Sequence, residues 1–229
     1  MTDLIIALDV PRIEDAGDWV DRLGETVGWY KVGLELFTRE GAHIVKMLKE
    51  KGKNVFLDLK FHDIPRTVSR AVAQAAEMGI QMLSLHAAGG RAMMEAAAAQ
   101  VVNRAMPPRL LGVTVLTSMD AASLKEVGIR RSPRNWVTDL ALLAQDCGLD
   151  GVVASPREIR WIRSACGTGF LIVAPGIRSP GAPVQDQRRT ATPHMARKCG
   201  ADFIVVGRPI LESDDPLKST RKILKDLTK

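Results

Sequence analysis

The chain changes from strand to helix within one segment, Val55-Phe56-Leu57-Asp58-Leu59-Lys60-Phe61-His62-Asp63-Ile64-Pro65. The segment begins with a short, largely apolar run, which predicts a buried strand over Val55–Leu59. Pro65 begins a stretch of helix formers with the apolar periodicity of a helix, and we expect a helix over Pro65–Met78. A strand followed at once by an amphipathic helix is the repeating unit of parallel sheets, so the segment predicts an α/β fold.

The same alternation recurs along the chain at intervals of roughly 25 residues. Further β-rich runs predict strands at Leu4–Leu8, Tyr30–Gly33, Met82–His86, Leu110–Leu116, Gly151–Ala154, Phe170–Ala174 and Phe203–Val206. Helical stretches between them include Arg91–Ala105, Pro133–Cys147 and Thr192–Cys199. Eight such units fit a chain of 229 residues, and Asp9-Val10-Pro11 stands where a dinucleotide-binding fold would carry a glycine-rich loop. We therefore predict a single (β/α)8 TIM barrel, one domain over residues 1–229.

The charge of the chain gives little reason to expect a nucleic-acid partner. The formal net charge is +6 and the pI about 9.4, but Lys and Arg do not cluster among aromatic residues. We interpret them mainly as a solvated surface, with small anionic substrates as the functional reason for the remaining bias. The N-terminus has no basic leader and no apolar run is long enough to span a bilayer, so we expect a cytoplasmic protein without membrane contact. Three cysteines without CxxC spacing predict neither disulfides nor a zinc site.

Charged residues stand where the first three strands end, at the edge where barrels place their active sites: Asp9, Lys31, Asp58 and Lys60. Asp58 and Lys60 are two residues apart, so both project to the same side of a strand. A structural ion pair would explain these two alone. The alternation of carboxylates and ammoniums over neighbouring strands favours a catalytic cluster. A lysine among carboxylates stays protonated, which suits a reaction that destabilises an anionic group and then protonates a carbanion.

The last two strands are followed by residues typical of a phosphate site, Gly176-Ile177-Arg178 and Gly207-Arg208. Glycine lets backbone N–H groups approach an anion, and arginine offers a bidentate fork. The loop Gly176–Arg189 has the composition of a lid, with a plain surface loop as the alternative. We interpret His86 as a core histidine that supports the charged cluster, in preference to a catalytic one. Because histidines do not gather at metal-ligand spacing, we expect no metal.

The segment Asp58–Pro65 resembles the signature of bacterial orotidine 5'-monophosphate decarboxylases. The resemblance extends to Ala7-Leu8-Asp9, Lys31-Val32-Gly33, Leu85-His86-Ala87-Ala88-Gly89-Gly90, Thr114-Val115-Leu116-Thr117-Ser118-Met119, Pro175-Gly176-Ile177-Arg178, Asp186-Gln187-Arg188-Arg189 and Val206-Gly207-Arg208-Pro209. It implies conversion of orotidine 5'-monophosphate to UMP and CO2, the last step of de novo pyrimidine biosynthesis, by a homodimer without metal or cofactor. One departure is Arg66, where bacterial relatives often carry Asn. We expect this change to alter the subunit interface or the local surface, and of the implied contacts it bears only on the fine geometry around Thr67.

The resemblance also implies a role for each site residue. Lys60 would protonate C6 of the pyrimidine, Asp58 would crowd the departing carboxylate, and Lys31 with Asp63 would complete the charged network. The residues implied to enter the partner subunit's site are Asp63, Ile64 and Thr67. The implied substrate contacts are Asp9 and Lys31 to the ribose, Thr117 and Ser118 to the pyrimidine, and Arg178, Gln187, Gly207 and Arg208 to the 5'-phosphate.

Two other interpretations stay open. Mg²⁺-dependent sugar-phosphate decarboxylases and aldolases of the same superfamily share the DxKxxD motif, but they typically carry Glu at the position of Lys31, where an ammonium would oppose a divalent cation. A non-catalytic nucleotide binder is the alternative from another class. It would leave the charged set unexplained.

Overall fold

Eight parallel strands close into a barrel in the computed structural model, which describes residues 2–178 and 191–228. The strands are β1 (Asp3–Ala7), β2 (Trp29–Val32), β3 (Asn54–Phe61), β4 (Met82–His86), β5 (Arg109–Val113), β6 (Gly151–Val153), β7 (Leu171–Ala174) and β8 (Phe203–Val206). Each strand pairs with the next, and β8 closes the barrel on β1. The prediction of a (β/α)8 barrel is confirmed.

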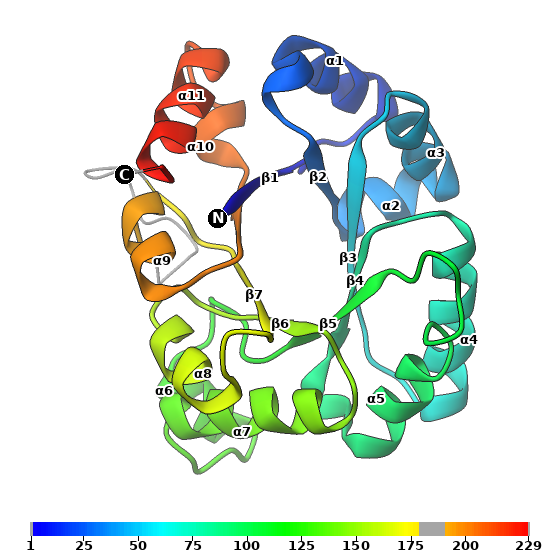
Figure 1. The fold of residues 1–229 in the computed structure, drawn as a ribbon, viewed down its shortest axis with the longest axis vertical. Helices are drawn as coiled ribbons and strands as arrows, with labels where there is room; N and C mark the ends of the chain where they lie inside the picture. Colours follow the sequence, from blue (N-terminus) through cyan, green and yellow to red (C-terminus); the bar gives the residue numbers. More distant parts are fainter. Residues whose placement is uncertain (1, 179–190, 229) are drawn as a thin grey trace.

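Helices form an outer ring around the strands (Figure 1). The described residues form α1 (Ile13–Leu23), α2 (Leu34–Glu40), α3 (Ala42–Glu50), α4 (Pro65–Glu77), α5 (Arg91–Ala98), α6 (Ala121–Glu126), α7 (Pro133–Asp146), α8 (Ile159–Cys166), α9 (Pro193–Cys199), α10 (Arg208–Leu211) and α11 (Pro216–Asp226), with short 3-10 turns at Gly24–Thr26 and Ala87–Gly89. Several begin at a local start signal. Ser132, for example, caps α7 through the N–H of Asn135, and Pro133 follows at the first helical position. No helix in the described part of the chain is long and apolar enough to cross a membrane.

Strand residues alternate between two apolar layers, and this alternation positions the site. Ile5 and Ala7 belong to the cluster inside the barrel, whereas Leu4 and Ile6 belong to the cluster between strands and helices. Asp9 is two residues beyond Ala7 and continues the inner series at the carboxyl end of the strand. The polar site residues are therefore members of the inner layer, at the end where it opens to solvent.

Two strand ends differ from the sequence-based expectation. The third strand continues past Leu59 to Phe61, because its pairing with β4 shifts register between Leu57 and Phe61 and absorbs the extra residues. The fifth strand was expected to reach Leu116 but ends at Val113. The chain turns soon afterwards, where the N–H of Met119 bonds to the carbonyl of Leu116.

The helix after β4 was expected to continue to Ala105, but it ends at Ala98. The β-branched residues Val101 and Val102 follow, and such residues continue a helix poorly. The Arg104 guanidinium also donates to the carbonyl of Gln100 at 3.0 Å, which satisfies a group left open when the helix stops.

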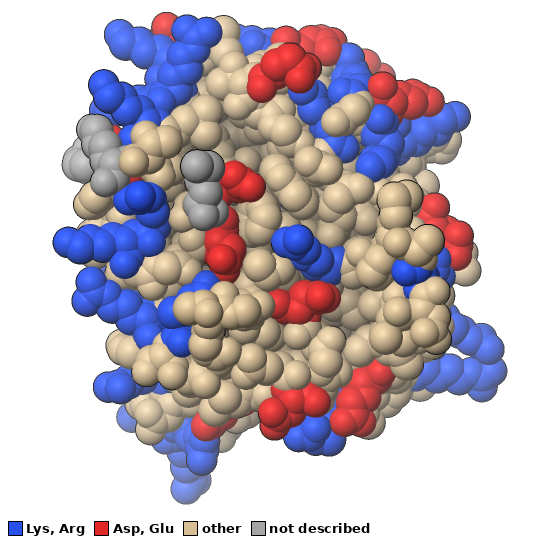
Figure 2. Space-filling model, in the orientation of Figure 1, with Lys and Arg blue, Asp and Glu red and all other residues tan. Residues whose placement is uncertain are grey.

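Lys and Arg side chains are spread around the periphery of the face seen in Figure 2, with Asp and Glu among them. This agrees with the interpretation of the positive net charge mainly as a solvated surface.

Candidate active site

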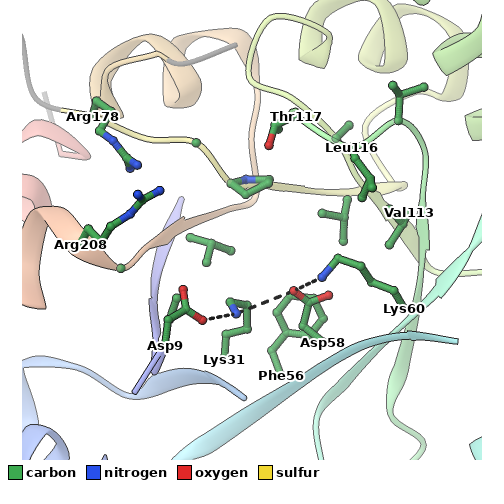
Figure 3. A pocket seen from close by; sticks show the side chains of 18 residues that line it. Asp9, Lys31, Phe56, Asp58, Lys60, Val113, Leu116, Thr117, Arg178 and Arg208 are labelled. Carbon is green, nitrogen blue, oxygen red and sulfur yellow. Dashed lines mark hydrogen bonds and ion pairs between the residues drawn. The ribbon is translucent and has the colours of Figure 1, made fainter. Parts of the chain in front are cut away.

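The carboxyl ends of the strands surround a cavity of about 210 Å³ (Figure 3). Nine of the residues singled out from the sequence line it: Asp9, Lys31, Asp58, Lys60, Thr117, Gly176, Arg178, Gly207 and Arg208. The structure thus brings these residues together at one end of the barrel. Gln187 and most of the expected lid at Gly176–Arg189 lie outside the described residues.

A row of alternating charges crosses the cavity. The Lys31 Nζ lies 3.0 Å from Asp9 Oδ1 and 3.9 Å from Asp58 Oδ2. The Lys60 Nζ lies 2.8 Å from the same Oδ2 of Asp58. Figure 3 shows this row running without a break from Asp9 to Lys60. Because neighbouring strands β1, β2 and β3 position the four side chains, the spacing of the charges is fixed by the sheet.

Asp58 is the most buried member of the row, with its side chain 9% exposed. Burial alone would raise the pKa of its carboxyl, but the ammonium groups of Lys31 and Lys60, with hydrogen bonds from Lys60 and Ser84, outweigh burial and lower the pKa. Asp58 is therefore a carboxylate at neutral pH. In a poorly solvated cavity its charge repels any second anion placed beside it. The neighbouring ammonium of Lys60 can donate a proton at the same place.

Lys60 is held in an unusual backbone conformation. Its φ of 51° is the only positive value at a non-glycine position in the described part of the chain. For an ordinary L-residue the left-handed region costs about 1–2 kcal/mol, and such strain gathers at functional sites. The conformation lies within the register shift between β3 and β4, so the irregularity of the strand is located at the lysine that faces the cavity.

Reasoning from the sequence missed Ser84, which contacts both Asp58 and Lys60. Its hydroxyl donates to Asp58 Oδ1 at 2.7 Å and accepts the N–H of Lys60 at 3.0 Å. A hydroxyl within the otherwise apolar Met82–Leu85 was the only visible signal, and its partners depend on the register between two strands.

Two arginines approach the opposite part of the cavity. The guanidinium groups of Arg178 and Arg208 point toward the same space, on the side of the cavity opposite Lys60 (Figure 3). Gly207 keeps this side narrow, since a Cβ there would lie 3.3 Å from the Cβ of Ala7 and 3.4 Å from Asp9 Oδ2. Gly176 has a φ of 80°, which favours glycine. Two guanidinium groups beside glycine backbone can bind a phosphate with charge-assisted hydrogen bonds.

The apolar wall of the cavity also escaped the sequence-based analysis. It includes Phe56, Val113, Val153 and Val205, which belong to the inner layer of the barrel. Phe56 is two residues before Asp58, so the two-residue period could have placed it on the same face. Between this wall and the row of charges, the cavity can hold a flat ring with an anionic substituent.

Four of the predicted site residues do not line the cavity of their own chain. Asp63, Ile64 and Thr67 are exposed around the start of α4, and the Ile64 residue is 66% exposed. The Asp63 carboxylate accepts the N–H of Ile64 at 2.6 Å. Ser118 is exposed next to Thr117, which does line the cavity.

His86 is half-buried, and its ring centre lies 5.2 Å from that of His62. Burial lowers the pKa of His86, and the neighbouring His62 and Lys60 lower it further against a smaller opposing effect of Asp58. A neutral imidazole beside the charged row fits the supporting role expected from the sequence. Among residues 2–178 and 191–228, no three His, Cys, Asp or Glu side chains are grouped so that they could hold a metal ion.

Comparison with protein families gives a match over nearly the whole chain. The model of the orotidine 5'-phosphate decarboxylase / HUMPS family matches residues 2–223. Two curated relatives, from Syntrophotalea carbinolica and Moorella thermoacetica, are each 50% identical and each cover 98% of this chain. The chain covers 94% and 91% of their lengths, respectively. Both are named orotidine 5'-phosphate decarboxylase.

Solved structures agree with these matches. An orotidine 5'-phosphate decarboxylase from Lactobacillus acidophilus is 36% identical, covers 100% of both chains and superposes with a TM-score of 0.87. An uncharacterized conserved protein from Geobacillus kaustophilus is 40% identical, with a TM-score of 0.85 over 98% of this chain and 99% of its own.

Proposed function

The chain belongs to the orotidine 5'-phosphate decarboxylase / HUMPS family, and we propose that it decarboxylates orotidine 5'-monophosphate to UMP and CO2. The observation that carries this proposal is the row Asp9, Lys31, Asp58 and Lys60, which places a buried carboxylate 2.8 Å from an ammonium. Few reactions need both a carboxylate that repels an anionic substituent and an ammonium that donates a proton at the same carbon atom. Loss of CO2 from a pyrimidine leaves a carbanion where an anionic substituent stood before, so both groups act at C6.

In the proposed reaction Asp58 acts before Lys60. The carboxylate of the substrate lies against that of Asp58, and their repulsion is relieved as the bond to C6 breaks and CO2 leaves. The electron pair stays on C6, where the ammonium of Lys60 stabilises the charge and then supplies the proton. The resulting amine takes a proton back from solvent. Lys31 holds Asp58 ionised throughout, and the cycle consumes no cofactor.

Binding of the remote part of the substrate positions the reacting carbon. Arg178, Arg208 and the backbone at Gly207 take the 5'-phosphate, and Asp9 with Lys31 takes the ribose hydroxyls. Thr117, which lines the cavity, lies against the pyrimidine, with the exposed Ser118 next to it in the chain. Gln187, the further phosphate contact in this proposal, lies outside the described residues. Binding energy gained at the phosphate can thus hold the substrate carboxylate against that of Asp58. Without that energy, the two charges would repel each other apart in a poorly solvated cavity.

The functional unit in this proposal is a homodimer. Asp63, Ile64 and Thr67 are exposed and stand outside the cavity of their own chain, although Asp63 follows Lys60 by only three positions. An isoleucine that is 66% exposed beside an active site suits an interface better than open solvent. We place these three residues at the partner subunit's cavity. The proposal further includes a single catalytic domain over residues 1–229 and a cytoplasmic location.

A Mg²⁺-dependent reaction on a sugar phosphate fits this site less well. The Lys31 ammonium lies between the two carboxylates that could otherwise coordinate a cation, 3.0 Å from Asp9 and 3.9 Å from Asp58. A divalent ion there would meet a positive charge in place of an oxygen ligand.

The direct test is to incubate chelator-treated protein with orotidine 5'-monophosphate and to follow both the loss of orotate absorbance and the release of CO2. Conversion to UMP without added metal is the expected result. A folded protein that binds the nucleotide without consuming it would instead be a nucleotide binder. Activity that appears only with a sugar phosphate and Mg²⁺ would assign the chain to the other branch of the family.

A further inference from the structure

We propose that Ser84 is a positioning residue for the decarboxylation, because one hydroxyl fixes the carboxylate of Asp58 and the backbone of Lys60 together. This inference rests on the proposed roles of Asp58 and Lys60 and adds a residue that touches neither the cavity nor the substrate. Ser84 lies in β4, is 0% exposed, and is the only polar residue in the run Met82–Leu85.

In its two hydrogen bonds, the Ser84 hydroxyl can act only as the donor to Asp58 and as the acceptor from Lys60. Asp58 is ionised and can only accept, and the backbone N–H of Lys60 can only donate. The Ser84 proton must therefore point to Asp58 Oδ1, at 2.7 Å, while a lone pair of the same oxygen accepts from Lys60, at 3.0 Å. The hydroxyl cannot rotate without breaking both bonds, so it couples the two residues rigidly.

Ser84 also supports the irregular part of β3. The register pairs Leu57 with Leu83 and then Phe61 with Leu85, so three residues of β3 stand opposite the single residue Ser84 of β4. Lys60 adopts its φ of 51° inside this bulge. There its N–H bonds to the Ser84 hydroxyl in place of a ladder carbonyl, which offsets part of the cost of the left-handed conformation.

Both oxygens of Asp58 are consequently occupied. Ser84 holds Oδ1, and Lys60 Nζ approaches Oδ2 at 2.8 Å. The carboxylate cannot turn about its axis, and the lysine side chain starts from a fixed backbone. Because Ser84 is absent from the cavity wall, its removal should disturb the geometry of reaction while leaving the substrate contacts in place.

Steady-state kinetics of Ser84→Ala test the proposal. We expect kcat to fall by about 10- to 100-fold, because displacement of a reacting group by up to about 1 Å has an effect of this size. KM should stay within about twofold of wild type. Loss of a hydrogen bond to the charged form also moves the acid limb of the kcat profile, and the pKa of Asp58 followed by carboxyl NMR, to higher pH. Ser84→Thr keeps the hydroxyl and should recover most of the rate.

Thr220→Val is the matched control, since Thr220 is equally buried but donates to the carbonyl of Pro216 in α11, away from the cavity. It should lose stability without a change in kcat or in the acid limb. If Ser84→Ala does not fold, Ser84→Cys preserves the volume with a much weaker donor and replaces it in each measurement.

An unchanged kcat and an unchanged Asp58 titration in a folded Ser84→Ala or Ser84→Cys variant would overturn the proposal. An equal loss of kcat in Thr220→Val would show that the effect comes from general destabilisation, and this result would overturn the proposal as well. Failure of the proposed function is distinguishable, because the wild-type protein would then not decarboxylate, whereas the Asp58 titration would still measure the coupling to Ser84.

Discussion

At the scale of the residue, the site depends on keeping Asp58 ionised while it is almost fully buried. Burial opposes the charge. The charge of Lys31 is the largest single effect that sustains it, and Lys60 contributes through both its charge and a hydrogen bond. A carboxylate kept charged in this way is the source of the repulsion that drives CO2 from the substrate in the proposed mechanism. Lys31 is therefore expected to control the acid limit of activity without giving a proton itself.

Replacing Lys31 by Met should lower kcat by about 10²-fold or more and move the acid limb of kcat/KM to higher pH. Without the ammonium, burial is opposed by fewer favourable effects, so the pKa of Asp58 rises and the inactive acid form appears earlier as pH falls. Folding stability depends on pH in the same direction as activity. The lowered pKa of Asp58 contributes stability above the ordinary Asp value, and this contribution is lost as pH falls through the lowered pKa.

Lys51→Met provides the matched comparison for Lys31→Met. Lys51 makes a 2.6 Å ion pair with Asp21 on the surface, so its loss removes a similar contact far from the cavity. It should leave the pH profile in place. An equal displacement of the acid limb in both variants would argue against a specific effect of Lys31 on Asp58.

The sequence predicted which side chains share the site better than how the backbone places them. Asp58 and Lys60 were expected on one face because they are two residues apart, and their 2.8 Å contact agrees with that expectation. The regular strand assumed in that reasoning does not exist, since Lys60 lies in a bulge with positive φ. A lysine gives no local signal for this conformation. The conformation occurs inside the register shift, where the Lys60 N–H bonds to Ser84 on another strand, and one segment of sequence cannot reveal this pairing.

At the scale of the element, close contact between strands explains why some positions admit only glycine. Gly151 begins β6 and pairs with Leu171 of β7. A Cβ at Gly151 would lie 2.5 Å from the Cβ of Leu171 and would also meet its carbonyl oxygen, so the backbone itself would have to move. The apolar run predicted β6, but the need for glycine comes from the distance to a strand about 20 residues later.

Gly151→Ala should lower the free energy of unfolding by about 1–3 kcal/mol, because the added methyl overpacks a fixed backbone contact. Gly169→Ala is the control, since a Cβ there meets nothing within 4 Å. It should be neutral or slightly stabilising through its effect on the unfolded chain. Urea unfolding measures both, and equal stability of the two variants would show that β6 and β7 can separate without cost.

Strand centres were predictable from the sequence and element ends were not. The runs at β4 and β8 match their predicted bounds because both are largely buried and mostly apolar. The Arg104 contact with the Gln100 carbonyl follows the end of α5, and a turn at Leu116 follows the end of β5. Both are contacts outside the periodic pattern on which the predictions were based.

At the scale of the whole molecule, the proposed sharing of Asp63 between subunits makes a prediction about mixed dimers. Lys60→Ala and Asp63→Ala homodimers should each be nearly inactive. After mixing and re-pairing at random, half of the dimers are mixed and each carries one complete site, so about a quarter of the wild-type activity should return. The measurement is decarboxylation after mild dissociation and reassociation.

The control for this experiment mixes Lys60→Ala with Asp58→Ala. These residues contact each other within one chain, so every site in every mixed dimer lacks one of them and no activity should return. Recovery in both mixtures, or in neither, would contradict a site that combines Lys60 of one chain with Asp63 of the partner.

The central claim is that Lys60, held among carboxylates, gives the proton to C6. Its most direct test compares turnover and UMP binding in Lys60→Ala, with the exposed Lys222→Ala as a surface control. We predict that Lys60→Ala loses at least about 10³-fold in kcat while calorimetry shows UMP bound within a few-fold of wild-type affinity, since the phosphate contacts are on the other side of the cavity. Decarboxylation by Lys60→Ala at a rate close to that of Lys222→Ala would contradict the account.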